Sequence, residues 1–153
     1  MRSRMRVSKC LAGCKDFPCT DVKHECYIIP NIEIVPSEVS IALVSEAAPA
    51  DPRDYYYARG NPLFQQTTVQ AFKDAGANVS SIGDLVKLGV YFTTAVKCGK
   101  TGYGVRSDTI NRCSLILEKE LDLFPNLKAF MLMGDVAIKA LNQIAKRAGQ
   151  HRV

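Results

Sequence analysis

Short apolar runs alternate along the chain with segments whose apolar residues recur at helical spacing. Three runs rich in β-branched, aromatic or other large apolar residues predict strands, at 39–45, 90–96 and 128–133, and we expect the first of them to be buried. Four segments with apolar residues three or four positions apart predict helices: 62–75, a shorter one from Ser81 to Gly89, one from Ser107 to Pro125, and one after Gly134. Strands and helices that alternate in this way form βαβ units, which build a parallel sheet covered on both faces.

Polar and helix-breaking residues mark where these helices begin and end. Asn61 stands before Pro62 and is a candidate N-cap, because its side chain can accept a hydrogen bond from a free N–H group of the first turn. Ser81 and Ser107 hold the same position before the next two helices. Pro125 ends the third helix because proline has no N–H group to continue it.

The fold class that we expect from this order is α/β, with three layers (α/β/α) and a parallel central sheet. In such sheets ligands bind beyond the carboxyl ends of the strands, so the loops 46–61 and 97–106 should carry most of the chemistry. The loop 46–61 has two prolines, a tyrosine triplet and mixed charge, and we expect it to contribute little to the core. The pattern ends after a helix, at 149–153, where a further strand would begin, and we expect the last strand to be missing from this chain.

The composition fits a single domain over residues 1–153, in which residues 1–32 form a cysteine-rich N-terminal segment. Apolar residues make up 47% of the 153 positions and charged residues 23%, as in globular proteins. No apolar run reaches the roughly 20 residues of a membrane helix, and no apolar stretch follows the basic start as in a secretory signal. We therefore expect a cytoplasmic protein with no membrane partner. The net charge of +5 is compatible with a nucleic-acid partner and equally with none.

Cysteines are the most restrictive candidates. Four of the six lie within residues 10–26, without a helical or strand period, and the others are Cys98 and Cys113. Two of the N-terminal four could join Cys98 and Cys113 as a set of four thiolates, which suits a [4Fe–4S] cluster or zinc. The irregular spacing favours the cluster, since structural zinc usually uses two compact cysteine pairs. The alternative is that Cys113 is a buried apolar thiol and that the others bind nothing.

Charged and aromatic residues at the predicted strand ends are weaker candidates. Glu46 ends the first strand and Asp51 follows it, so either carboxylate could orient or deprotonate a water, although a helix cap or a solvated charge is the simpler reading. Phe64 could stack on a base, but its helical spacing with Phe72 also fits a core position. The basic loop offers three cations that could approach a phosphate backbone: Lys97, Lys100 and Arg106.

Four short motifs, taken together and in order, resemble the uracil-DNA glycosylase superfamily. VSEAAP at 44–49 is similar to its Gly-Glu-Ala-Pro-Gly type turn, and GNPLFQQT at 60–67 is similar to its Gly-x-Pro-Phe segment. YFTTAVKC at 91–98 is similar to its Thr-Asn-x-x-Lys-Cys motif, and LMGDVAIKAL at 132–141 is similar to its Leu-Gly-Asn-x-Ala motif. The resemblance covers residues 39–145 and is closest to the iron–sulfur branch of the superfamily.

This resemblance implies a cofactor as well as a uracil-DNA-glycosylase-like fold with four parallel strands. The cofactor is a [4Fe–4S] cluster held by two N-terminal cysteines together with Cys98 and Cys113. For the N-terminal pair we take Cys10 and Cys14, although the family spacing is Cys-x₂-Cys and the spacing here is longer. Zinc remains the alternative metal.

The resemblance also implies a reaction on uracil-containing DNA. A deoxyuridine would flip out of the duplex into a pocket at the strand ends, where water cleaves the N-glycosidic bond. The chain would thus be a DNA-repair glycosylase. Five residues would serve this reaction: Glu46 and Asp51 in catalysis, and Phe64, Thr94 and Ala47 in substrate binding.

Two departures from the family pattern keep other functions open. Thr94 stands where the family has the asparagine that reads the pairing edge of uracil, and a hydroxyl cannot make the same bidentate contact. The last catalytic segment of the family, a loop resembling His-Pro-Ser, has no counterpart here. The alternative is a non-catalytic nucleic-acid-binding module of the same fold with a structural metal site, and a weaker one is a zinc or thiol-redox protein.

Overall fold

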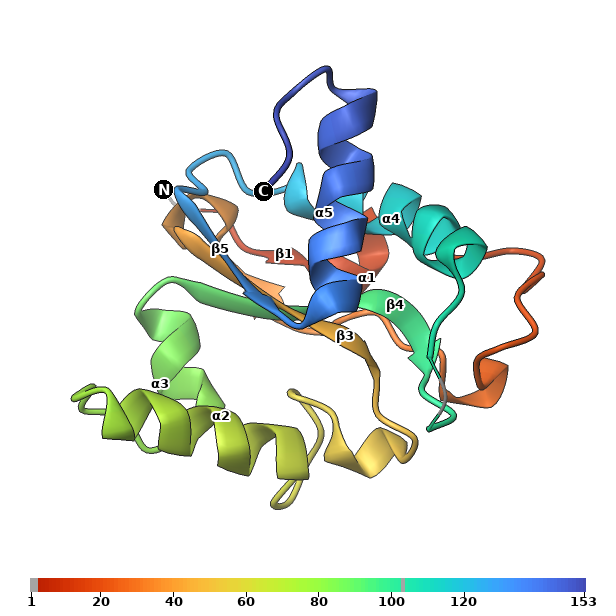
Figure 1. The fold of residues 1–153 in the computed structure, drawn as a ribbon. Helices are drawn as coiled ribbons and strands as arrows, with labels where there is room; N and C mark the ends of the chain where they lie inside the picture. Colours follow the sequence, from red (N-terminus) through yellow and green to blue (C-terminus); the bar gives the residue numbers. More distant parts are fainter. Residues whose placement is uncertain (1–2, 103) are drawn as a thin grey trace.

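A parallel sheet of three strands forms the centre of the computed structural model, which describes residues 3–102 and 104–153. The strands are β3 (Ile41–Ala48), β4 (Val90–Gly99) and β5 (Ala129–Met133), in the order β4-β3-β5. Figure 1 shows α2 (Leu63–Asp74) and α3 (Ile82–Lys87) on one face, and α4 (Ser107–Leu121) and α5 (Asp135–Arg147) on the other. The prediction of an α/β fold with a parallel sheet flanked by helices is confirmed.

The central strand, β3, sets the register of the sheet. Leu43 lies beside Phe92 of β4 and Met131 of β5. Every residue of β4 is buried, as expected of a strand covered on both faces. The strands β3 and β4 run further than the sequence predicts because their ends still pair, with Ala48 beside Gly99. This extension carries both strands into the segments where we expected function.

The side of the sheet that faces α2 and α3 has an aromatic core. Its buried residues include Tyr55 and Tyr56, which are 1% and 4% exposed. The hydroxyl of Tyr57 donates to the carbonyl of Phe92 (2.8 Å) and accepts from its N–H (2.8 Å). The expectation that the loop 46–61 adds little to the core is therefore wrong, because the short helix η3 (Pro52–Asp54) turns the tyrosine triplet back onto the sheet.

The helix starts differ in detail from those predicted. The Ser81 side chain caps α3 by accepting from the N–H of Asp84 (3.1 Å), as expected. Pro62 and Arg106 hold the N-cap positions of α2 and α4, and neither provides a side-chain cap, so Asn61 and Ser107 do not act as the predicted caps. In the described ranges, no helix combines the length and apolar character needed to cross a membrane.

The N-terminal segment has more structure than its sequence indicates. The strand β1 (Met5–Arg6) pairs antiparallel with β2 (Glu33–Ile34), and the remaining short elements of the region are α1 (Val7–Cys10), η1 (His24–Cys26) and η2 (Pro36–Glu38). Lys23 exchanges two backbone hydrogen bonds with Gly99 (2.8 and 2.9 Å), and Ile28 donates to the carbonyl of Lys97 (2.9 Å). The segment is therefore attached to the carboxyl end of β4.

Candidate functional site

Four cysteines from separate parts of the chain line one cavity of about 190 Å³, the cysteine cavity. Cys14 and Cys19 come from the N-terminal segment, Cys98 from the end of β4, and Cys113 from α4. Because residues this far apart in sequence meet only through the fold, their common position is a property of the tertiary structure. The cavity is the most specific chemical feature that the sequence predicted for this chain.

Local contacts hold the N-terminal side of the cysteine cavity. The hydroxyl of Tyr27 accepts a hydrogen bond from the N–H of Cys14 (2.9 Å), which fixes the backbone of this cysteine. Gly13 passes so close to Tyr27 that a Cβ atom on Gly13 would lie 2.6 Å from the hydroxyl oxygen. A side chain at this position would therefore displace the Tyr27 hydroxyl from its contact with Cys14.

Asp21 attaches the N-terminal segment to the start of α4. Its carboxylate accepts from the N–H of Arg106 (2.7 Å) and from the hydroxyl of Thr109 (2.6 Å). Burial raises the pKa of Asp21, but these hydrogen bonds outweigh it, and the net pKa lies below the usual value of 3.8. The ionised carboxylate thus keeps the segment with Cys19 beside the helix with Cys113.

The thiols of the cavity are electrostatic neighbours. Burial raises the pKa of Cys98 to about 12, and the neighbouring thiols of Cys113, Cys14, Cys19 and Cys26 act in the same direction. Burial also raises the pKa of Cys113. A hydrogen bond from the backbone N–H of Lys97 and the charge of Lys97 lower it in part. Both shifts disfavour the thiolate forms of Cys98 and Cys113, and a positive charge in the cavity would act in the opposite direction.

The cysteine cavity brings four thiols together without forming a ready-made site for a single metal ion. No group of three or more histidine, cysteine or acidic side chains that could hold a metal ion occurs among residues 3–102 and 104–153. A cluster supplies its own bridging sulfides, so its thiolate ligands surround a space instead of converging on one ion. His24 also lines the cavity, and its buried Nε2 has no hydrogen-bond partner within the described part of the chain. A buried polar atom normally has a partner, and a group in the cavity could supply it.

The N-terminal pair at the cavity is not the one that we predicted. Cys10, at the end of α1, is exposed and does not line the cavity, and Cys19 takes its place beside Cys14. Cys26 is buried elsewhere, with its thiol donating to the carbonyl of Ala50 (3.3 Å). The spacing of the cysteines in the sequence could not identify this pair. The contacts of the N-terminal segment with β4 and α4 decide which of its cysteines reach the cavity.

A second cavity, of about 390 Å³, lies at the carboxyl ends of the strands; we call it the strand-end cavity. Four residues that the sequence predicted meet here: Glu46, Ala47, Phe64 and Lys100. Sequence reasoning missed several others that line the cavity: Ser45, Gly102, Gly104, Val105, Met133 and Val136. The sequence feature that could have identified Met133 and Val136 is the Gly134 turn, which follows the third strand at the same edge of the sheet. Tyr103, in the same loop as Gly102 and Gly104, lies outside the described residues.

Phe64 and Lys100 form the aromatic and cationic side of the strand-end cavity. The ring of Phe64 contacts that of Tyr56 edge-on, with centroids 5.2 Å apart. The ammonium group of Lys100 lies 5.7 Å from the centroid of Phe64, within the range of a cation–π contact. Phe64 is only half-buried, whereas its neighbour Leu63 is exposed and does not line the cavity. An aromatic ring beside a cation suits a base and the phosphate attached to it.

Glu46 has a structural contact in addition to its place in the strand-end cavity. One carboxylate oxygen, Oε2, accepts from the N–H of Val136 in the first turn of α5 (2.9 Å), where the helix dipole favours a negative charge. Gly134 makes room for this contact, because a Cβ atom there would lie 2.6 Å from the carboxyl carbon of Glu46. Its φ of 116° also disfavours other residues. The helix-cap reading of Glu46 thus accounts for one of its two oxygens.

Asp51 and Thr94 do not line the strand-end cavity. The Asp51 carboxylate pairs with Arg53 (2.7 Å) and caps η3, and this pairing lowers the pKa of Asp51 to about 2. A carboxylate of such low pKa is a weak base. Thr94 is fully buried, and its hydroxyl donates to the carbonyl of Val96 (2.8 Å). The structure thus gives both residues other contacts than the predicted catalytic and base-binding ones.

The three predicted DNA-binding cations have different environments. Lys97 is fully buried and paired with Glu120 of α4, so the prediction that it contacts DNA is wrong. The sequence analysis placed Lys97 in a basic loop. In the structure β4 continues through Lys97, and its side chain points toward α4. Lys100 and Arg106 are exposed on the loop after β4 and remain available to a phosphate backbone.

Both cavities use the carboxyl end of β4. Cys98 belongs to the cysteine cavity, and Lys100 in the next loop belongs to the strand-end cavity. No family model, curated protein or solved structure matches this chain. The chemistry of the two cavities and the motif resemblance are therefore the grounds on which a function can be proposed.

Proposed function

We propose that this chain is the core of a DNA glycosylase that removes uracil from DNA by hydrolysis of the N-glycosidic bond. In this proposal its fold is uracil-DNA-glycosylase-like, and Cys14, Cys19, Cys98 and Cys113 hold a [4Fe–4S] cluster. The observation that carries the proposal is the adjacency of the two cavities at one end of β4. The motif resemblance predicts this same neighbourhood of cluster and base pocket. The cluster would attach the N-terminal segment to the sheet.

Phe64 and Lys100 would recognise a nucleotide flipped into the strand-end cavity. Stacking on an aromatic ring contributes about 1–3 kcal/mol for each base in proteins that bind single strands. The exposed ammonium group of Lys100 would pair with the phosphate, and Arg106 on the same loop would extend the contact along the backbone. The volume of about 390 Å³ suits a small ligand such as a nucleobase with part of its sugar.

Glu46 would provide the charge needed at the reacting bond. As the bond breaks, positive charge develops on the sugar and negative charge on the departing base. A carboxylate at the cavity wall would stabilise the sugar or hold the attacking water, and the contact with Val136 fixes its position.

A specific observation favours the alternative, a nucleic-acid-binding module that performs no cleavage. The Thr94 hydroxyl is engaged inside the sheet, so it offers no contact to the pairing edge of a base. Asp51 is likewise held by Arg53. Binding without excision would be the result of such a site.

Excision and binding measured on the same oligonucleotide distinguish these two functions. The substrate is a labelled single strand with one uracil, and alkali-induced cleavage reports base removal while fluorescence anisotropy reports binding. We expect excision by the full chain, and we expect Phe64→Ala to weaken both signals about tenfold through lost stacking. The matched control is Leu63→Ala, the adjacent exposed residue outside the cavity, which should change neither.

Each outcome of this experiment bears on the assignment. Binding that Phe64→Ala weakens, without any excision, would favour the non-catalytic module. Equal effects of Phe64→Ala and Leu63→Ala would remove the strand-end cavity as the site. Neither binding nor excision would contradict both functions.

A further inference from the structure

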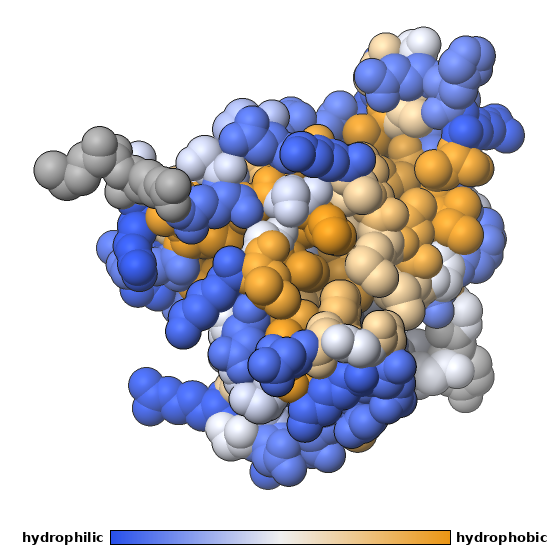
Figure 2. All heavy atoms as spheres, turned by 90° about the vertical axis from the view of Figure 1, so that its left-hand side faces the viewer, coloured by the Kyte–Doolittle hydropathy of each residue, from blue (hydrophilic) through white to orange (hydrophobic). Residues whose placement is uncertain are grey.

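β5 forms an open edge of the sheet, and its side chains are apolar. Among the described strands it pairs with β3 alone, so its outer side has no neighbouring strand. Phe130, Met131 and Met133 are 45%, 37% and 52% exposed. Figure 2 views the molecule from this side and shows apolar side chains extending across it, bordered by polar ones. Open apolar edges of this kind promote association.

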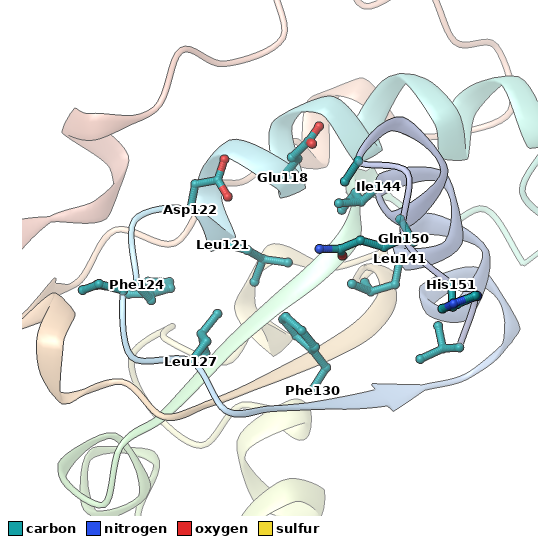
Figure 3. Close-up of a pocket in the computed structure, with 14 residues that line it drawn as sticks. Glu118, Leu121, Asp122, Phe124, Leu127, Phe130, Leu141, Ile144, Gln150 and His151 are labelled. Atoms are coloured by element: carbon teal, nitrogen blue, oxygen red, sulfur yellow. The ribbon is translucent and has the colours of Figure 1, made fainter.

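Grooves accompany the β5 edge on both faces of the sheet. On the face of α4 and α5, a groove of about 530 Å³ is lined by Phe130, Leu121 and Leu141, which Figure 3 shows converging on it. On the face of α2, a groove of about 340 Å³ is lined by Met131 and Met133. A strand placed beside β5 would therefore bury apolar side chains on both of its faces.

The peptide groups on the open side of β5 can be identified. Ala129 donates its N–H to Ser40, the residue before β3 (3.3 Å). Because alternate residues of a parallel strand direct their N–H and C=O groups to opposite sides, those of Phe130 and Leu132 point away from β3. These are the groups to which a further strand would bind.

We propose that a second copy of this chain pairs with β5 in an antiparallel, two-fold symmetric contact centred on Met131. The symmetry places Phe130 of one copy opposite Leu132 of the other, so the outward peptide groups of the two strands meet each other. Each side chain stays on its own face, and the two sheets become one continuous sheet. The proposal does not depend on the proposed base-excision function.

Charge complementarity supports a second copy as the occupant. Residues 129–133 carry no charge, whereas Lys128 precedes them and Asp135 follows them. The antiparallel contact brings Lys128 of each copy close to Asp135 of the other, at both ends of the pair. Asp135 binds Lys139 on its own helix (2.6 Å), but its side chain is 71% exposed and can accept a second cation. A parallel arrangement would place like charges together.

Analytical ultracentrifugation of the full chain over a series of concentrations tests this contact. We expect a reversible monomer–dimer equilibrium, and we expect Met131→Lys to weaken the dimer about tenfold or more, because it places two like charges at the symmetry axis. The matched control is Leu88→Lys, at an apolar residue that is 65% exposed between α3 and β4, the strand at the other edge of the sheet. It should leave the equilibrium unchanged.

Exchange of the end charges keeps the test valid if Met131→Lys disturbs folding. Lys128→Glu and Asp135→Lys should each weaken the dimer, and the double variant should restore it. Restoration supports the antiparallel contact. A chain that is monomeric at every concentration, a double variant that fails to restore the dimer, or an equal effect of Leu88→Lys would overturn the proposal.

Discussion

A buried ion pair between Lys97 and Glu120 joins β4 to α4. Both side chains are fully buried, and Glu120 also accepts hydrogen bonds from the hydroxyls of Tyr91 and Thr93. Lys97 donates to the carbonyl of Thr94 (2.6 Å) and to the hydroxyl of Thr93 (2.8 Å). A buried ion pair is tolerated when its remaining donors and acceptors are satisfied in this way. Loss of either partner leaves an uncompensated charge in the core.

Removal of one partner should therefore be far more damaging than removal of both. We expect Glu120→Ala to lower the free energy of unfolding by about 3–5 kcal/mol, and the double variant Lys97→Met with Glu120→Leu to recover most of this loss. Urea unfolding followed by circular dichroism measures both. The control is Glu118→Ala, which breaks the partly exposed pair with Arg147 (3.0 Å) and should cost about 1 kcal/mol or less. A similar loss for Glu118→Ala and Glu120→Ala would contradict this account.

The sequence predicted single residues well where a strand end alone decides their position. Glu46 and Ala47 lie near the end of β3, Lys100 follows β4 and Phe64 lies in the first turn of α2, and the structure brings them to one cavity. The prediction from sequence failed for Lys97, because the burial of this residue depends on the carboxylate of Glu120 in a later helix. The pattern around Lys97 contains nothing that reveals this partner.

At the scale of elements, the first turn of α4 and the N-terminal segment depend on each other through Asp21. Its carboxylate accepts from the N–H of Arg106 and from the hydroxyl of Thr109, which stabilises the start of the helix and also holds the segment with Cys19 beside the helix with Cys113. A negative charge is favourable at this position because the N-terminus of a helix carries a partial positive charge. The same contact thus orders an element and shapes the cysteine cavity.

The Asp21 contact should make stability depend on pH in the acid range. Since the folded pKa lies below 3.8, the stabilisation is fully present above the unfolded value and is lost as the pH falls through the lowered folded value. At neutral pH we expect Asp21→Asn to lower the free energy of unfolding by about 1.5–3 kcal/mol, as for hydrogen bonds to a charged group. The difference from the wild type should shrink as the pH approaches 3 in urea titrations.

Asp16→Asn is the control for this prediction, because Asp16 is an exposed carboxylate of the same segment. It should leave stability unchanged at either pH. A destabilisation by Asp21→Asn that is equally large in acid would show that the charge of Asp21 is not what holds the segment.

Elements with regular hydrophobic periods were predictable from the sequence, and those held by distant contacts were not. The strands β3, β4 and β5 and the helices α2, α3, α4 and α5 follow their predicted segments to within a few residues, because each carries an apolar run or stripe with the period of its element. The N-terminal segment has no such period. Its structure comes from backbone pairing of Lys23 with Gly99 and from Asp21, contacts that no local pattern encodes.

At the scale of the whole molecule, the carboxyl end of β4 connects the sheet, the N-terminal segment and both cavities. Gly99 allows this connection, since a Cβ atom there would lie 2.5 Å from the Cβ of Cys26. The opposite side of the sheet ends in the apolar edge of β5. This edge adjoins the candidate chemistry at Met133, which is exposed on β5 and also lines the strand-end cavity.

The iron content and visible absorption of the chain, prepared under anaerobic conditions, test the central claim most directly. We predict about four iron ions per chain and the broad visible band of a [4Fe–4S] cluster. Cys19→Ser should abolish both, while Cys10→Ser, an exposed thiol outside the cavity, should retain them. A chain that binds no iron, or one that loses it with Cys10→Ser and keeps it with Cys19→Ser, would contradict the assignment of the cysteine cavity.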